Sequence, residues 1–195
     1  MARARLAARK KGARRLGAEV AFLDETGHTF RARVGTTWAP AGHTPVLTRR
    51  NRRREVSSVV LLTAPLDRRP ARLLARHVVG TIRTPELLAA LRYFHRHLDR
   101  PVMLVWDHSR VHRARAVAAF VAAHPTWYRL EWLPGYAPEL NPEELCNGAV
   151  KRAMLNALPD SPEALRGMAR RHFVQLGRHP DLLRACFDHA GLNLN

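Results

Sequence analysis

Acidic residues are scarce in this chain, and so are lysine and cysteine. Asp and Glu number 16 against 33 Lys and Arg, so the formal net charge is +17 and the isoelectric point is near 11.6. Only three basic residues are lysines, so arginine supplies nearly all of the positive charge. Such an excess indicates a polyanionic partner, and nucleic acid is the first candidate.

The two cysteines, Cys146 and Cys186, are too few for a disulfide framework or a zinc site. We expect them to be reduced packing residues. Apolar runs such as VMLVW are too short to cross a bilayer, and the Arg/Ala-rich start lacks the apolar centre of a secretory signal. The sequence therefore predicts a cytoplasmic protein with no membrane partner, and 195 residues suit one domain.

Basic residues gather in two places. Residues 1–17 form a basic arm that either lies on phosphates or is a solvated tail, and one domain is expected from residue 18 to 195. After His28 the pattern favours two hairpin-linked strands with a basic tip. That tip either contacts DNA or is a solvated loop, and it contains Arg49, Arg50, Arg52, Arg53 and Arg54.

Two apolar runs each close on an aspartate. Glu19 to Leu23 reads as a buried strand followed by Asp24, and VMLVW as a second followed by Asp107. Helical patterns begin at Thr84 and Ala114. A third strand is expected over residues 128–133. The alternation predicts an α/β domain with a partly parallel sheet, and the C-terminal ends of parallel strands share one edge.

The third strand leads into the stretch LPGYAPELNPEELCNGAVK, residues 133–151. Asn141 is suited to cap a helix that starts at Pro142, and Glu144 falls where a capping box places its acid. That helix is expected to run to Leu158. Two more helices are expected over residues 162–176 and 181–192.

Three acids, Asp24, Asp107 and Glu144, could converge on this edge. Each one alone could equally be a turn or cap residue. Together they would repel one another unless cations were bound, and oxygen ligands suit Mg²⁺ or Mn²⁺. Two such ions can promote phosphoryl transfer by stabilising the attacking and leaving oxygens.

The pieces FLDETG, WAPAGHTP, VWDHSRVH and LPGYAPELNPEE, followed by Lys151, resemble the successive motifs of mariner-like DDE transposases. They are most similar to the bacterial insertion-sequence family numbered 630. The resemblance spans roughly residues 18–158. Its order and spacing fit as well, with 83 residues from Asp24 to Asp107 and 37 from Asp107 to Glu144.

The resemblance implies a ribonuclease-H-like fold, a mixed central sheet flanked by helices, with Asp24, Asp107 and Glu144 as metal-binding catalytic acids. It implies cleavage of transposon ends by water and transfer of the freed 3′-hydroxyl into target DNA. Asp24 would contact both ions, and the other two acids one each. The acid of this family follows the NPx triplet, so Glu144 is preferred to Glu143.

Other roles follow from the same resemblance. Lys151, back on the helical face of Glu144, would contact a phosphate. His112 would orient DNA or the attacking water, or else is a solvent-exposed histidine at a helix start. Asn147 stands where the family has tryptophan, a departure that raises the possibility of a decayed copy.

Relatives carry helix-turn-helix modules before the catalytic domain, whereas 23 residues precede Asp24 here. We therefore expect either a separately encoded recognition protein or a truncated copy. The paired-end chemistry of the family implies a homodimer on DNA, and we expect a location on a bacterial nucleoid. Two other functions stay open: an inactive or repurposed DNA-binding remnant, and a nuclease of the same fold that does not join strands.

Overall fold

A computed structural model describes residues 17–30, 35–48, 55–67, 69–135, 138–192 and 194. The basic arm up to residue 16 lies outside the described residues. So do all five arginines of the expected hairpin tip, Arg49, Arg50, Arg52, Arg53 and Arg54.

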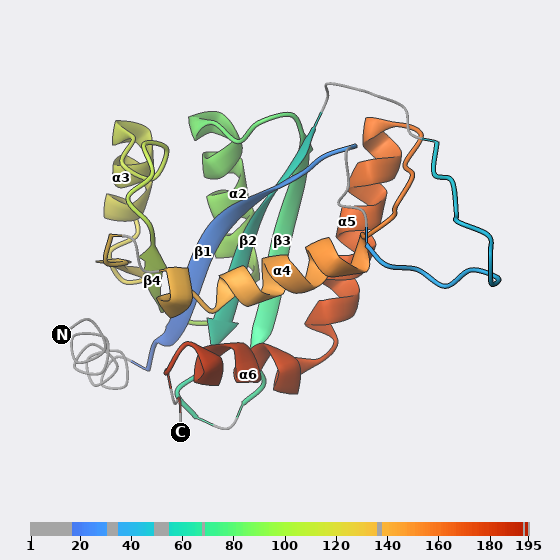
Figure 1. Cartoon of the computed structure of the whole chain (residues 1–195). Helices are drawn as coiled ribbons and strands as arrows, with labels where there is room; N and C mark the ends of the chain where they lie inside the picture. The colour runs from blue at the N-terminus through green and yellow to red at the C-terminus, as the bar shows by residue number, and fades with distance from the viewer. Residues whose placement is uncertain are drawn as a thin grey trace.

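Strands and helices alternate along the chain after an initial group of three strands (Figure 1). The strands are β1 (Glu19–His28), β2 (Val56–Ala64), β3 (Arg72–Val79), β4 (Val102–Trp106) and β5 (Tyr128–Trp132). The helices are α2 (Thr84–His97), α3 (Arg115–Ala122), the short 3₁₀ turn η1 (Pro138–Leu140), α4 (Glu143–Ala153), α5 (Pro162–Gly177) and α6 (Pro180–His189).

The five strands form one mixed sheet in the order β3-β2-β1-β4-β5. β1 pairs antiparallel with β2 and parallel with β4, and β4 pairs parallel with β5. β1 therefore lies at the centre, with hydrogen-bonded neighbours on both sides. The mixed sheet expected from the sequence is confirmed.

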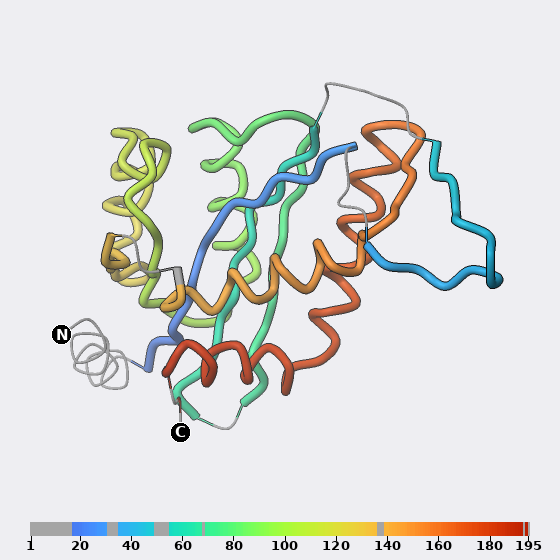
Figure 2. The backbone as a smooth tube through the Cα atoms, in the orientation of Figure 1, coloured from blue at the N-terminus to red at the C-terminus, as the bar shows by residue number. Residues whose placement is uncertain are grey.

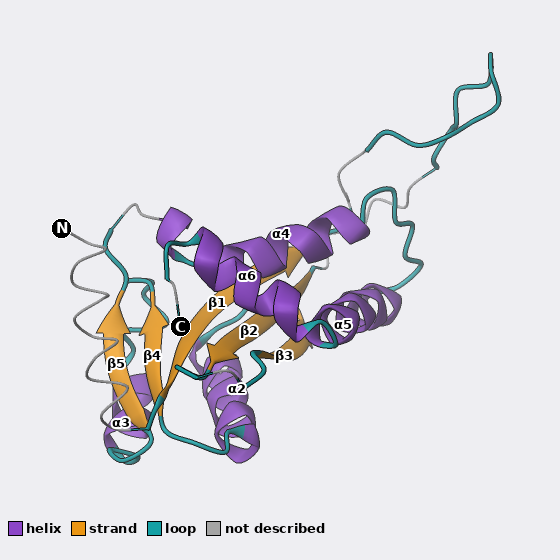
Figure 3. Ribbon diagram, turned by 90° about the horizontal axis from the view of Figure 1, so that it is seen from below, coloured by secondary structure: helices purple, strands orange, loops and turns teal. Residues whose placement is uncertain are grey.

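Helices cover both faces of this sheet, with α4, α5 and α6 on one face and α2 and α3 on the other (Figure 3). Successive β1 side chains alternate between the faces. Phe22 packs edge-on against Phe187 of α6, with ring centroids 5.9 Å apart. Leu23 packs in the other core, with Leu87 of α2. The alternation consequently directs Asp24 toward α4 and its neighbour Glu25 toward the opposite face.

β1 is longer than the expected strand, because it continues past Leu23 to His28. Its partner β2 accompanies it to the end, where His28 pairs with Val56. The prediction of a strand between His28 and the arginines is wrong in residues 35–48. Those residues contain no strand and project away from the sheet (Figure 2).

The helix α5 ends within one residue of its expected end, whereas α4 stops at Ala153 rather than Leu158 and α6 stops at His189 rather than residue 192. Shortly beyond α4, Asn156 adopts a positive φ of 60°, a left-handed conformation that cannot continue a helix. Ser161 then caps α5 by accepting a hydrogen bond from the Ala164 backbone N–H. No helix among the described residues has both the length and the apolar character that crossing a membrane requires.

Candidate active site

Asp24 and Asp107 lie at the same level of the sheet. In the parallel pairing of β1 with β4, Phe22 is opposite Val105, and each aspartate lies two residues further along its chain. The 83-residue spacing in the sequence is thus the register offset of these two strands. Parallel neighbours are about 4.8 Å apart, so this register brings the two aspartates close together.

Asn141 connects the start of α4 to β1. Its amide nitrogen donates to Asp24 Oδ2 over 3.1 Å, while its own Oδ1 accepts from the Glu143 backbone N–H over 3.2 Å. This contact forms in the turn before α4, which begins at Glu143 with Pro142 at its cap and has no side-chain capping bond, so the expected capping box of Asn141 and Glu144 is wrong. The link to Asp24 was not predicted, because a capping pattern carries no information about a strand 117 positions away.

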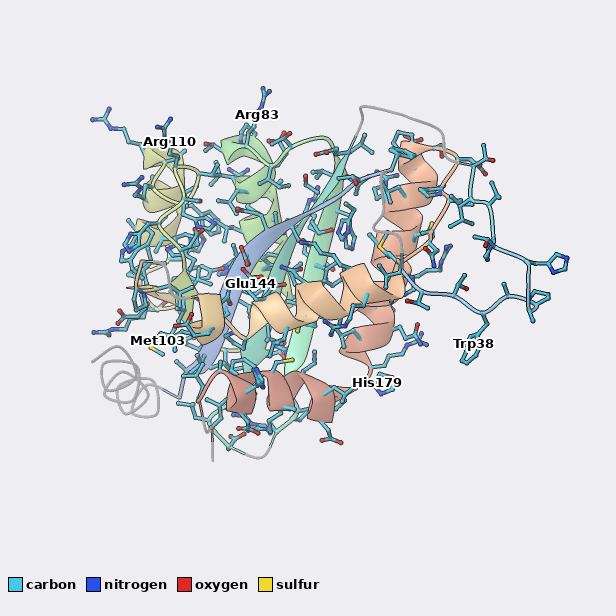
Figure 4. The ribbon with its side chains drawn as sticks, in the orientation of Figure 1. Trp38, Arg83, Met103, Arg110, Glu144 and His179 are labelled. Atoms are coloured by element: carbon cyan, nitrogen blue, oxygen red, sulfur yellow. The ribbon has the colours of Figure 1, made fainter. Side chains whose placement is uncertain are left out.

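The two adjacent glutamates of α4 lie in different surroundings. Glu144 is exposed at the start of the helix, beside β1 (Figure 4). Glu143 has no exposed surface, and Asn147 donates to its Oε2 over 2.5 Å. Of the two glutamates, Glu144 is thus the one with an exposed side chain, and its role as the third acid, which the family resemblance implies, stays a prediction.

The electrostatics of Asp24 indicate that the acids converge. Burial is the main cause that raises the pKa of Asp24 to about 6, and the hydrogen bond from the Glu25 backbone N–H partly opposes it. The negative charges of Glu144, Glu25 and Asp107 raise this pKa further. Asp24 therefore lies within electrostatic range of the other two acids that the sequence singled out, Asp107 and Glu144.

Convergence does not amount to a ready-made metal cage. Within the described part of the chain, no group of three His, Cys, Asp or Glu side chains surrounds a single point closely enough to hold an ion. The donor set nonetheless fits a hard cation, since it consists of carboxylate oxygens whose mutual repulsion a bound cation would relieve.

His112 is buried, so the expectation of a solvent-exposed helix-start histidine is wrong. Its Nδ1 donates to Asp107 Oδ1 over 2.7 Å, and its Nε2 to Glu25 Oε1 over 2.9 Å. Its ring stacks on Trp106, with centroids 4.7 Å apart. Both ring nitrogens are engaged by carboxylates of the protein, and the predicted role of His112 in orienting DNA or the attacking water stays a prediction.

The pKa of His112 reflects these two partners. Burial lowers it, but the hydrogen bond and charge of Glu25 together with the charge of Asp107 outweigh burial, so the pKa is raised above its ordinary value. His112 thus links Glu25 to Asp107, and Glu25 is the residue of this link that the sequence did not single out. In the sequence Glu25 is notable only as the neighbour of Asp24, and strand alternation places its side chain on the opposite face.

Lys151 lies exposed on α4, near enough to Glu143 and His28 for its charge to lower the pKa values of both groups. It is two helical turns beyond Glu144, as the sequence predicts. A contact with phosphate stays a prediction, as do the DNA contacts of the five arginines outside the described residues.

Comparison of the chain with protein-family models gives a match over residues 19–166 to the DDE superfamily endonuclease family. The comparison with curated protein sequences found no match.

Solved structures with a similar fold include transposases and a viral integration complex. The mariner Mos1 paired-end complex with Mg has a TM-score of 0.56 and 18% identity, over 95% of this chain and 60% of that chain. The Mos1 transposase catalytic domain with Raltegravir and Mn has a TM-score of 0.50 and 16% identity, over 97% of this chain and 92% of that chain. The simian T-cell lymphotropic virus intasome with a PP2A regulatory subunit has a TM-score of 0.51 and 15% identity, over 77% of this chain and 46% of that chain.

These likenesses concern the fold, and the chain spans about 60% of the Mos1 chain in the paired-end complex with Mg. The mixed five-stranded sheet flanked by helices is the ribonuclease-H-like arrangement that the sequence predicted. The family match covers Asp24, Asp107 and Glu144 together with the strands and helix that hold them. The chain therefore belongs to the DDE superfamily endonucleases.

Proposed function

We propose that this endonuclease domain, residues 18–195, is the catalytic domain of a DNA transposase of the kind found in the bacterial insertion-sequence family numbered 630. It would cut DNA at transposon ends and transfer the freed 3′-hydroxyl into target DNA. The observation that carries the proposal is the convergence of Asp24, Asp107 and Glu144, which comes from the β1–β4 register and the docking of α4.

The acids would hold two Mg²⁺ or Mn²⁺ ions, with Asp24 between them. Support comes from the oxygen-only donor set and from the negative charges that Glu144 and Asp107 place near Asp24. The similar Mos1 structures include complexes with Mg and with Mn. Bound divalent ions would supply the positive charge that the attacking and leaving oxygens need in phosphoryl transfer.

The remaining side chains orient the acids and bind the substrate. Asn141 fixes the direction of the Asp24 carboxylate, and His112 does the same for Asp107. Lys151 contacts a phosphate of the bound DNA on the face where Glu144 is exposed. The net charge of +17 favours DNA as the partner. We further propose a homodimer on DNA, a separately encoded helix-turn-helix protein that recognises the ends, and action on the nucleoid.

The test is nicking of supercoiled plasmid DNA with Mg²⁺ or Mn²⁺ by the parent protein and by Asp107→Asn. We expect Asp107→Asn to nick at least about 100-fold more slowly, because it removes charge stabilisation from the transition state. Asp99→Asn is the matched control, since Asp99 is exposed and paired with Arg72. Equal rates for Asp107→Asn and the parent would show that Asp107 is not a catalytic acid.

A strand-joining assay separates the proposal from a nuclease of the same fold. A labelled duplex that carries the terminal inverted repeat of the element, with a free 3′-hydroxyl, is incubated with target plasmid and Mg²⁺. A transposase joins the label to the plasmid, whereas a nuclease only shortens the duplex. A repurposed remnant would bind both DNAs and change neither.

A further inference from the structure

The two cysteines of the chain meet in the folded structure although 40 positions separate them. Cys146 lies on α4 and Cys186 on α6, and both thiols are free. The two sulfur atoms are 3.9 Å apart, and the thiol of Cys146 donates to Cys186 Sγ. The pair is therefore in direct contact, with nothing between the sulfurs.

The two thiols differ in their access to solvent. Cys146 has no exposed surface and belongs to the apolar core beneath α4. Cys186 is half-buried, and its thiol donates to the Leu182 carbonyl oxygen over 3.3 Å, one turn earlier on α6. A small molecule can thus reach Cys186 from solvent, while Cys146 is enclosed next to it. An accessible thiol beside a second thiol is the arrangement of a redox-sensitive pair.

The two helices that carry the cysteines pack beside each other on one face of the sheet (Figures 1 and 3). Next to Cys186, the fully buried Phe187 packs edge-on against Phe22 of the central strand β1. Leu183, one turn earlier on α6, also has no exposed surface. α6 is therefore anchored to the sheet, and a bond between the sulfurs would act on α4.

α4 begins at the candidate site, so its position affects the acids. Glu144 is two residues before Cys146, and Asn141 in the preceding turn donates to Asp24. A disulfide holds its sulfurs about 2.05 Å apart, so these two must approach by roughly 1.9 Å. Close packing around Cys146 restricts rotation of its side chain. Part of the approach therefore falls on the backbone of α4, which shifts Glu144 relative to Asp24.

We propose that Cys146 and Cys186 form a disulfide when a hydroperoxide such as hydrogen peroxide oxidises them, and that this bond displaces α4 and lowers nicking. Cys186 reacts first: its thiol takes one oxygen from the peroxide and becomes a sulfenic acid, and one water leaves. The Cys146 thiol then attacks the sulfenic sulfur, so that the S–S bond forms, the S–O bond breaks and a second water leaves. Two thiols and one peroxide thus give one disulfide and two waters.

A dithiol reverses the modification. It is oxidised to its own disulfide through a mixed disulfide, and both cysteine thiols are regenerated. The reduced pair is the resting form in a compartment that keeps thiols reduced, where disulfides are transient and redox-sensing. Formation of the bond is independent of the proposed function, whereas its effect on nicking rests on that function.

The experiment treats the parent, Cys146→Ser and Cys186→Ser with hydrogen peroxide in metal-free buffer, and catalase then removes the peroxide. Unreduced peptides are analysed by mass spectrometry, and nicking is measured with Mg²⁺ before and after dithiothreitol. In the parent we expect a peptide that links Cys146 to Cys186 within one chain. Nicking should be at least about 10-fold slower, because a small displacement of a catalytic group can cost about 100-fold in rate. Dithiothreitol should restore it.

The serine variants separate the disulfide from general oxidation. Cys186→Ser should nick like the reduced parent both before and after peroxide, because its enclosed Cys146 is protected and has no partner. In Cys146→Ser, Cys186 should gain oxygen and form no intramolecular link. If Cys146→Ser does not fold, the parent and Cys186→Ser still decide the question.

Three results would overturn the inference while the proposed function stands. The first is a parent in which no peptide links the two cysteines. The second is a link between two chains through Cys186, seen as a dimer on a non-reducing gel, with Cys146 still free. The third is a linked parent that nicks as fast as the reduced parent.

Failure of the proposed function has a separate signature. If the reduced parent does not nick DNA, the linked peptide still reports the bond, and amide hydrogen exchange of residues 138–147 reports the position of α4. Exchange that differs between the reduced and the linked protein supports a displacement of the helix. Unchanged exchange in these residues would overturn the inference.

Discussion

At the scale of single residues, the candidate site depends on pairs whose members are distant in sequence. His112 joins Glu25 of β1 to Asp107 after β4, and Asn141 joins α4 to Asp24. Neither connecting residue is an acid. Both fix the direction of a carboxylate that would otherwise rotate in response to its negative neighbours.

Replacing His112 by Phe keeps a ring to stack on Trp106 but removes both N–H donors. We expect a loss of about 1–3 kcal/mol in unfolding free energy, because Glu25 and Asp107 lose their shared partner. Denaturant unfolding of the two proteins measures it. His189→Phe, a change at an exposed histidine of α6, is the control.

The stability that His112 contributes should also depend on pH in a defined direction. The folded-state pKa of His112 is raised, so its contribution to stability is complete below the unfolded pKa of about 6.5 and is lost as the pH rises through the folded value. The stability gap between the parent and His112→Phe should therefore narrow as the pH increases. A gap that widened with pH would contradict the charged bridge.

At the scale of elements, a row of polar side chains crosses three neighbouring strands. His28 on β1 bonds to Ser58 on β2 over 3.0 Å, and Ser58 to His77 on β3 over 2.7 Å. Both histidine rings pack against Phe173 of α5. The row lies where α4 and α5 cover the sheet. His28 is buried and His77 half-buried, which favours the neutral form of both imidazoles.

Acid should destabilise the protein through this row. Burial lowers the pKa of His28 to about 4, and the charges of His77 and Lys151 lower it by smaller amounts. Burial also lowers the pKa of His77 to about 4, with smaller effects from the charges of Arg170 and Arg166. Because both folded values lie below the unfolded one, stability is complete above about pH 6.5 and falls toward pH 4. The loss is at most about 3 kcal/mol per histidine.

The matched test is the double variant His28→Gln, His77→Asn. Each amide keeps a polar atom near the nitrogen that bonds Ser58, but neither can be protonated in this range. We expect its stability to change less between pH 6.5 and pH 4 than that of the parent, as measured by denaturant unfolding at several pH values. An unchanged slope would assign the acid sensitivity to other groups.

At the scale of the whole molecule, the net charge of +17 should dominate DNA binding. For a protein that contacts six to ten phosphates, affinity falls by at least about 1,000-fold between 50 and 200 mM salt. Fluorescence anisotropy with a labelled duplex measures it. Asp107→Asn should show the same slope, because this variant removes no cation. A change of only a few-fold for the parent would contradict binding through the phosphates.

The sequence predicts those helices and strands whose apolar residues form a continuous run or recur at helical spacing. The run VMLVW gave β4, and the spacing of Leu87, Leu91 and Phe94 gave α2. β3 was missed because Arg72 and Arg76 interrupt its apolar pattern. On this edge strand Arg76 is exposed and Arg72 pairs with Asp99.

For the candidate site, the motifs singled out the three acids but not the residues that hydrogen-bond to them. Glu143 and Glu144 are chemically identical neighbours, and only the docking of α4 shows which of them is buried. Glu25 meets His112 across 87 positions of sequence, a contact that no local pattern encodes. Such partners are defined by tertiary packing alone.

The central place of β1 has a consequence for the order in which the chain acquires activity during synthesis. Asp24 gains Asp107 as a neighbour only after β4 has been made and has entered the sheet, and it gains Glu144 only after α4 has docked. These contacts are long-range and form late compared with local helices and hairpins. A ribosome-bound or misfolded chain therefore has no assembled site, so the capacity to cut DNA arises only in a chain that has completed its fold.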